Sequence, residues 1–156
     1  MMNETTITTI LSKWKPEGKA SLTMTLPESA WKLHVTAERC DEMSAQYWEL
    51  RLQRDGEDHE QTMDKWAEQV SGKQIGLLEI LKTLEIDSDR GETLLRSEAP
   101  TKRNDSLFYY ELVLQGNKAA TLRRFKGNYE AGSKREQMPF VLTHEVVEQL
   151  CQEVMF

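Results

Sequence analysis

Residues 107–126 read LFYYELVLQGNKAATLRRFK, and this stretch decides the fold. Two runs rich in aliphatic and aromatic residues flank Gly116-Asn117, a pair favoured in two-residue hairpin loops. The stretch therefore predicts an antiparallel hairpin. A two-residue loop also sets the register, so that Leu112 is expected to face Thr121.

The same register brings aromatic rings close to two consecutive arginines. Tyr110 is expected opposite Arg123, and Tyr109 opposite Arg124. Neighbours along a strand point to opposite faces of a sheet, so the two arginines are expected on opposite faces. Arg124 is then placed to stack on Tyr109 and to pair diagonally with Glu111.

Strand patterns continue on the N-terminal side of the hairpin. Apolar and polar residues alternate in 21–26, 31–38 and 47–53, which predicts a three-stranded antiparallel meander with one buried and one solvated face. Residues 75–86 fit a helix and a strand about equally, and we interpret them as a helix-to-strand transition. A short strand over 93–97 is expected to pair with its end.

Three further segments have apolar residues at the spacing of one helix face. We expect Asp58 to cap the second helix and Thr143 the last. The three apolar faces are Ile7, Ile10, Leu11 and Trp14; Met63, Trp66, Ala67 and Val70; and Val146, Val147, Leu150, Cys151, Val154 and Met155.

These elements predict an α+β fold in the order α-βββ-α-β(β)ββ-α. The chain has 156 residues, a usual size for one domain, and we expect a single domain over residues 1–156. The natural architecture is one antiparallel sheet of about six or seven strands with helices packed mainly on one face.

Composition excludes several classes of protein. A membrane-spanning helix needs about 20 consecutive apolar residues, and the chain contains no such run. Its first residues show no secretory leader. It has two cysteines, Cys40 and Cys151, which are too few for a fold held together by several disulfide bonds. We therefore expect a cytoplasmic protein without a membrane contact.

Catalytic and metal-binding patterns are missing from the sequence. The histidines His34, His59 and His144 lie far apart, and no pair of histidines or cysteines has metal-ligand spacing. Glycine-rich phosphate loops and nucleophile motifs are also missing. The pattern favours a protein without enzymatic activity, leaves catalysis open, and predicts neither cofactor nor metal.

Charge is unevenly distributed along the chain. The whole sequence carries a net charge of −6, which opposes binding to nucleic acid. Residues 90–135 nevertheless contain ten basic and five acidic residues, a net charge of +5, against −11 in the rest. This region coincides with the hairpin and with the two loops that flank it, 98–106 and 127–139.

If the loops converge on the hairpin, they form a site for a small anionic ligand or an acidic partner. The alternative is solvated charge on separate loops. The candidate residues are Arg123, Arg124, Lys102, Arg103, Lys126, Lys134, Arg135 and Tyr109.

The leading functional hypothesis is a protein that acts through macromolecular contacts, as an adaptor or chaperone-like interaction protein and as a homodimer. An uncovered, aromatic-containing sheet face is a natural association surface. The alternative is a small anionic-ligand-binding protein or enzyme that uses hairpin 107–126 and its flanking loops. The element order, chain length and pI near 5.2 are similar to those of class I type III secretion chaperones. The strands expected after residue 86 go beyond that pattern, and no residue role is carried over.

Overall fold

The computed structural model describes residues 4–56, 58–128 and 134–156. Within these ranges the helices are α1 (Glu4–Lys13), α2 (Met63–Val70) and α3 (His144–Val154). The strands are β1 (Ala20–Thr25), β2 (Trp31–Cys40), β3 (Ser44–Arg54), β4 (Leu81–Asp87), β5 (Glu92–Ser97), β6 (Thr101–Arg103), β7 (Ser106–Gln115), β8 (Ala119–Asn128), β9 (Glu136–Met138) and β10 (Phe140–Thr143).

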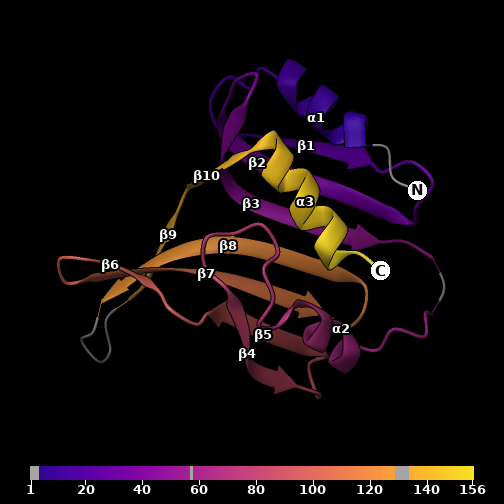
Figure 1. Cartoon of the computed structure of the whole chain (residues 1–156), viewed down its shortest axis with the longest axis vertical. Helices are drawn as coiled ribbons and strands as arrows, with labels where there is room; N and C mark the ends of the chain where they lie inside the picture. Colours follow the sequence, from indigo (N-terminus) through magenta and orange to yellow (C-terminus); the bar gives the residue numbers. More distant parts are fainter. Residues whose placement is uncertain (1–3, 57, 129–133) are drawn as a thin grey trace.

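All described strands belong to one antiparallel sheet (Figure 1). Its order is β1-β2-β3-β8-β7-β5-β4, while β6 pairs with β7, β9 with β8 and β10 with β3. The large antiparallel sheet and the three helices agree with the sequence-based expectation. The expected count of about six or seven strands is wrong, because three- and four-residue strands show no period.

β3 and β8 form a fork in the middle of the sheet. They pair only from Leu50, opposite Leu122, to Gln53, opposite Ala119. Beyond that ladder they separate, and β10 pairs with the first residues of β3 while β9 pairs with the second half of β8. Pro139, which has no backbone N–H to donate, lies between β9 and β10. The two short strands therefore line the inner edges of the fork.

The helices contribute to one hydrophobic core on one side of the sheet (Figure 1). α2 packs against β4, β5 and β7, and α3 packs against β3 and β10. α1 packs chiefly on α3, which differs from the expected packing of the helices mainly on one face of the sheet. Among the described residues, no helix is long and apolar enough to span a membrane.

The second and third helices begin at threonines. Thr143 Oγ1 accepts a hydrogen bond from Val146 N at 3.2 Å, which confirms the predicted cap of α3. At α2 the capping atom is Thr62 Oγ1, which accepts from Lys65 N at 3.2 Å. The prediction of Asp58 as this cap is wrong, because the helix begins several residues later.

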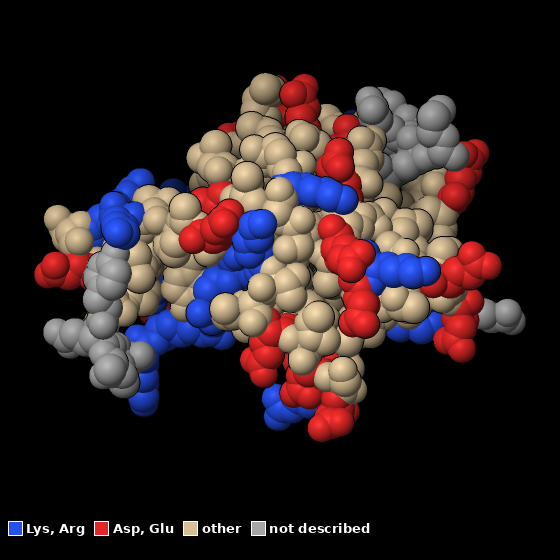
Figure 2. All heavy atoms as spheres, turned by 60° about the horizontal axis from the view of Figure 1, so that its bottom comes forward, with Lys and Arg blue, Asp and Glu red and all other residues tan. Residues whose placement is uncertain are grey.

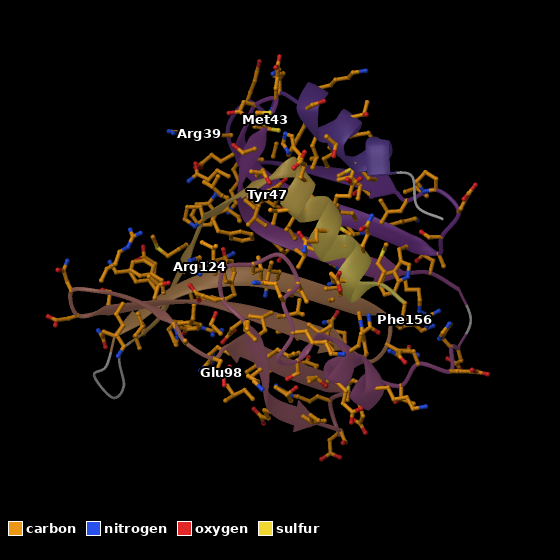
Figure 3. All side chains as sticks on the ribbon, viewed as in Figure 1. Arg39, Met43, Tyr47, Glu98, Arg124 and Phe156 are labelled. Carbon is orange, nitrogen blue, oxygen red and sulfur yellow. The ribbon has the colours of Figure 1, made fainter. Side chains whose placement is uncertain are left out.

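An aromatic cluster closes the core near the last residue, Phe156, which Figure 3 labels. The Trp66 ring lies 5.8 Å from the Trp31 ring and 5.4 Å from the Phe156 ring, centroid to centroid. The Trp66 indole Nε1 donates a hydrogen bond to the Val154 carbonyl oxygen at 2.7 Å. This indole therefore joins α2 to the end of α3.

The central hairpin is present with a register shifted by one residue. Leu112 faces Leu122 and Tyr110 faces Arg124, so the predictions of Thr121 and Arg123 as their partners are wrong. The loop has three residues instead of two, because β7 ends at Gln115 and β8 begins at Ala119.

Contacts outside the hairpin account for the longer loop. Asn117 accepts a hydrogen bond from Arg54 Nη2 at 3.3 Å and donates one to the Gln61 carbonyl oxygen at 2.8 Å. A hairpin sequence taken alone contains no information about these partners.

Residues 75–86 are a strand only in their second half. β4 begins at Leu81, whereas the expected helix before it is replaced by irregular chain. Ile75 and Leu77 are buried while Leu78 is fully exposed, so the apolar residues do not share a helix face. Gly76 has a φ of 105°, which a helix cannot accommodate.

Burial of Cys151 makes stability depend on pH. It raises the pKa of the Cys151 thiol from 9.0 to about 12. Above about pH 9 the unfolded chain loses this proton and the folded chain retains it, so the free energy of unfolding decreases as pH rises. We expect Cys151 alone to contribute a loss of about 1.4 kcal/mol between about pH 8 and about pH 10.

Urea denaturation of wild type and Cys151→Ala at several pH values measures this loss. The variant is expected to be less stable near neutral pH, because a small cavity forms, but its pH profile should be flatter, so the difference shrinks as pH rises. Parallel profiles for the two proteins would contradict the assignment.

Candidate functional site

The face of the sheet opposite the helices carries a network of arginine and glutamate side chains. We call it the open face. Arg123 of β8 and Arg96 of β5 lie in register with Glu111 of β7 from either side, and residues facing each other across strands share a face. Glu49 of β3 lies on the same face, where Arg123 Nη2 approaches its carboxylate to 2.6 Å.

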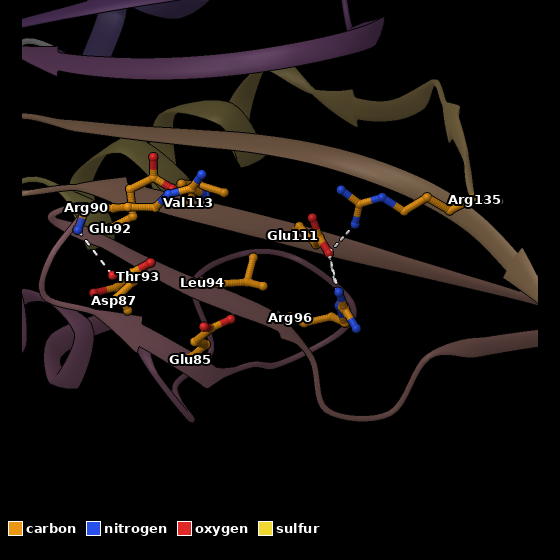
Figure 4. A pocket seen from close by; sticks show the side chains of 10 residues that line it. All are labelled: Glu85, Asp87, Arg90, Glu92, Thr93, Leu94, Arg96, Glu111, Val113 and Arg135. Atoms are coloured by element: carbon orange, nitrogen blue, oxygen red, sulfur yellow. Dashed lines mark hydrogen bonds and ion pairs between the residues drawn. The ribbon is translucent and has the colours of Figure 1, made fainter. Parts of the chain in front are cut away.

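Glu111 is the centre of this network. Its side chain is 5% exposed, and its Oε1 atom accepts hydrogen bonds from Arg96 Nη2 at 2.6 Å and from Arg96 Nε at 3.0 Å. Arg135, which directly precedes β9, donates from Nη1 to the same oxygen (Figure 4). The Glu111 carboxylate therefore accepts hydrogen bonds from two guanidinium groups.

Aromatic rings support the cations of the open face. The Arg135 guanidinium lies 3.8 Å from the centroid of the Phe125 ring, and Arg96 lies 4.9 Å from that of Tyr109. The two rings are themselves 6.0 Å apart. Burial lowers the pKa of Arg135, but hydrogen bonds to Tyr109 and Glu111 outweigh this effect and raise the pKa. The ring and carboxylate contacts thus hold both guanidinium groups in position.

Two hollows flank Arg135, and we name them by their charge. The acidic hollow, of about 540 Å³, has four carboxylates and three guanidinium groups in its wall. It lies over β4, β5 and β7, and Figure 4 shows it from close by. Glu85, Asp87 and Glu92 supply three of its carboxylates.

The basic hollow has a volume of about 400 Å³ and lies on the other side of Arg135. Its charged wall residues are Lys19, Arg123, Arg135 and a single acid, Glu49. Lys19, which precedes β1, places its Nζ atom 4.6 Å from the centroid of the Trp48 ring. This arrangement is suited to binding a negatively charged group.

Nucleophiles and metal ligands are not gathered on this face. In residues 4–56, 58–128 and 134–156, no three His, Cys, Asp or Glu side chains are placed to hold a metal ion. Burial raises the pKa of the Cys40 thiol, and Asp41 adds to the effect, so this thiol is a poor nucleophile. The described site can bind charged groups, and we assign it no catalytic step.

Three of the eight predicted site residues meet on the open face, namely Tyr109, Arg123 and Arg135. Arg124 points to the helix side, where its guanidinium lies 4.4 Å from the Tyr110 ring centroid. Its Nη2 atom donates to Glu79 Oε2 at 3.1 Å. The predicted stacking on Tyr109 and pairing with Glu111 are therefore wrong, because the register of the hairpin is shifted by one residue.

The other predicted cations lie away from this group. β6, the first half of β7, the second half of β8 and β9 project beyond the helices, and we call this extension the arm (Figure 1). Arg103 and Lys126 each lie 5.9 Å from the Phe108 ring centroid on the arm, where β6 also carries Lys102. Blue side chains accordingly predominate at the arm end of Figure 2.

The two flanking loops therefore do not form the single site expected from the sequence. The first loop contains β6 and belongs to the arm. The second brings Arg135 to the open face, while Lys134 is exposed and residues 129–133 lie outside the described residues.

A second group of exposed residues, which sequence reasoning did not single out, lies on β4 at the end of the sheet and in the chain just before it. Leu78 is 99% exposed, Leu84 57%, Ile86 45% and Ile80 37%. Leu84 and Ile86 lie on β4, and we call these two residues the aliphatic row. Leu78 and Ile80 belong to the chain that leads into the strand. The four residues account for most of the large exposed apolar side chains of the described chain. Isolated exposed aliphatics are ordinary, whereas four within nine residues are a local concentration.

The main-chain edge of β4 is partly closed beside this row. Gly72 N donates to Leu81 O at 2.7 Å, and Thr83 N donates to Ser71 Oγ at 3.0 Å. Covering an edge in this way limits strand addition. The first main-chain groups of β4 are therefore already hydrogen-bonded, whereas its aliphatic side chains remain exposed to solvent.

Several site residues could have been found from the alternation of polar residues. Glu49 lies on the polar side of a predicted strand, and Glu111 opposes Arg123 once the hairpin register is correct. Lys19 and Trp48 gave no such signal, because their contact joins a loop to an irregular part of β3. Comparison with family models, curated proteins and solved structures found no match to this chain.

Proposed function

We propose that this protein is a non-enzymatic interaction protein of the cytoplasm that acts through contacts with other protein chains and forms a homodimer. The aliphatic row carries this proposal, because Leu84 and Ile86 are exposed on β4, the strand at the end of the sheet. Its two cysteines are unpaired, which is in keeping with a reducing compartment.

The charges of β4 favour a second copy of this chain as the occupant of the row. Lys82 lies toward one end of the strand, and Glu85 and Asp87 toward the other. A two-fold axis repeats every contact, so two antiparallel β4 strands place each Lys82 opposite the carboxylates of the other copy. The strand is therefore complementary to itself in charge, with aliphatic side chains between the charges.

We expect wild-type protein to be a dimer at micromolar concentration and the variant Leu84→Lys/Ile86→Lys to be a monomer. Two lysines at the contact replace apolar area with charges that repel those of the other copy. Native mass spectrometry and light scattering after gel filtration measure the mass. The matched control is Met43→Lys/Val141→Lys, since these residues are 71% and 64% exposed outside the row.

The control variant should remain a dimer. Equal dissociation of both variants would show that added charge alone separates the chains, and a monomeric wild-type protein would remove the proposal. A charge exchange then tests the two-fold arrangement. Lys82→Glu and Glu85→Lys/Asp87→Lys should each dimerise weakly alone and form a heterodimer when mixed.

A further inference from the structure

Four cations at and beside the basic hollow are engaged by only two carboxylates of the described chain. Glu111 is shared by Arg96 and Arg135, and Glu49 is engaged by Arg123. Lys19 stacks on an aromatic ring and has no carboxylate partner among the described residues. This group of four cations and two carboxylates has an excess of two positive charges.

The excess is concentrated at the basic hollow. Three of the four cations line its wall, together with the rings of Trp48 and Phe125. Gln137 is held beside them, because its Nε2 atom donates to the Trp48 carbonyl oxygen at 2.8 Å. The aromatic and carboxylate contacts described above hold the cations in position. A ligand therefore meets donors that are already in place, which reduces the entropy lost on binding.

We propose that the basic hollow binds the carboxylates of an acidic segment from a partner protein. Guanidinium groups form paired hydrogen bonds to planar carboxylates, and Lys19 adds a third donor group at the rim. The hollow lies on the sheet face that none of the described helices covers, and it has aromatic walls, so the aliphatic part of a Glu side chain also finds apolar contact. This binding does not depend on the aliphatic row.

The neighbouring acidic hollow limits which anions fit. Glu85, Asp87 and Glu92 lie on the far side of Arg135 and repel a negative chain that continues across the face. A short acidic segment can occupy the basic hollow alone, whereas a nucleic acid strand would extend its phosphates over both hollows. Charge thus favours an acidic peptide over nucleic acid.

Fluorescence anisotropy with a labelled hexaglutamate peptide tests this proposal, with hexaglutamine as the uncharged probe. We expect only hexaglutamate to bind, with an affinity that decreases as salt increases. The variant Lys19→Gln/Arg135→Gln should weaken binding by about tenfold or more, because it removes two charge-assisted contacts. The matched control, Lys65→Gln/Arg103→Gln, removes the same charge from α2 and the arm and should change affinity less than about twofold.

Lys19→Gln alone provides a variant that keeps the fold, since this side chain is exposed and lies outside the core. It should weaken binding by about threefold or more. Equal loss in the control, equal binding of hexaglutamine, or binding of free citrate without hexaglutamate would each overturn the proposal. Measurement on Leu84→Lys/Ile86→Lys separates it from self-association, because hexaglutamate binding should persist whether or not that variant dimerises.

Discussion

Replacing Trp66 with alanine is expected to lower the free energy of unfolding by about 4 kcal/mol, the largest single effect foreseen for this chain. The indole is completely buried and packs against the rings of Trp31 and Phe156, which also contact each other. Its removal leaves a cavity where α2 meets the end of α3. It also removes the hydrogen bond to the Val154 carbonyl oxygen.

Two further variants separate the causes of this loss. Trp66→Phe keeps most of the ring packing but loses the indole N–H. Loss of this hydrogen bond should lower the free energy of unfolding by about 1 kcal/mol, in addition to the loss caused by the smaller ring. Trp48→Ala removes a tryptophan that is only half-buried on the open face. It should lower the free energy of unfolding by less than half as much as Trp66→Ala. Urea denaturation measures all three, and equal losses at the two tryptophans would contradict the role of Trp66 in the core.

Replacing Glu79 with alanine is expected to destabilise the protein by about 3 kcal/mol, the second largest effect. Glu79 and Arg124 form an ion pair that is mostly shielded from solvent, with the Tyr110 ring against the guanidinium. Glu79 Oε2 also accepts a hydrogen bond from Thr101 Oγ1 at 2.7 Å. Loss of the carboxylate leaves a buried positive charge without its partner.

Removing both charges should be far less harmful than removing one. Glu79 Oε1 and Arg124 Nη1 are buried without a hydrogen-bond partner among the described residues, so the pair is not fully satisfied. We expect Glu79→Met/Arg124→Met to lie within about 1 kcal/mol of wild type, because apolar side chains often replace a buried ion pair without loss. A double variant as unstable as Glu79→Ala would show that Arg124 does not depend on this carboxylate.

Local patterns predicted most of the elements and few of their long-range partners. Alternation identified β1, β2 and β3, and the helical spacing identified all three helices, because each pattern reflects one buried face. β9 and β10 were missed, because three or four residues are too short for a period and their pairing depends on the fork.

The one-residue error in the hairpin register had the largest consequence for the site. It shifted the expected cross-strand partners of Arg123 and Arg124 by one residue, and so assigned Glu111 to Arg124 when Arg123 faces it. A shift of one residue moves each side chain to the opposite face of its partner strand. The carboxylate partners Glu49 and Glu79 come from distant parts of the chain, and no local pattern contains that information.

The fork between β3 and β8 has a consequence for the order in which the chain can assemble. Half of β3 receives its second neighbour only from β10, and the core beneath it is filled by α3. In a nascent chain that has been synthesised only to β8, the start of β3 has no partner strand on the edge that later pairs with β10. The apolar face of β3 is then not covered by α3. Such contacts span most of the chain, and distant contacts form slowly. Folding during synthesis therefore waits for residues 136–154, which supply both the missing strands and the helix that covers them.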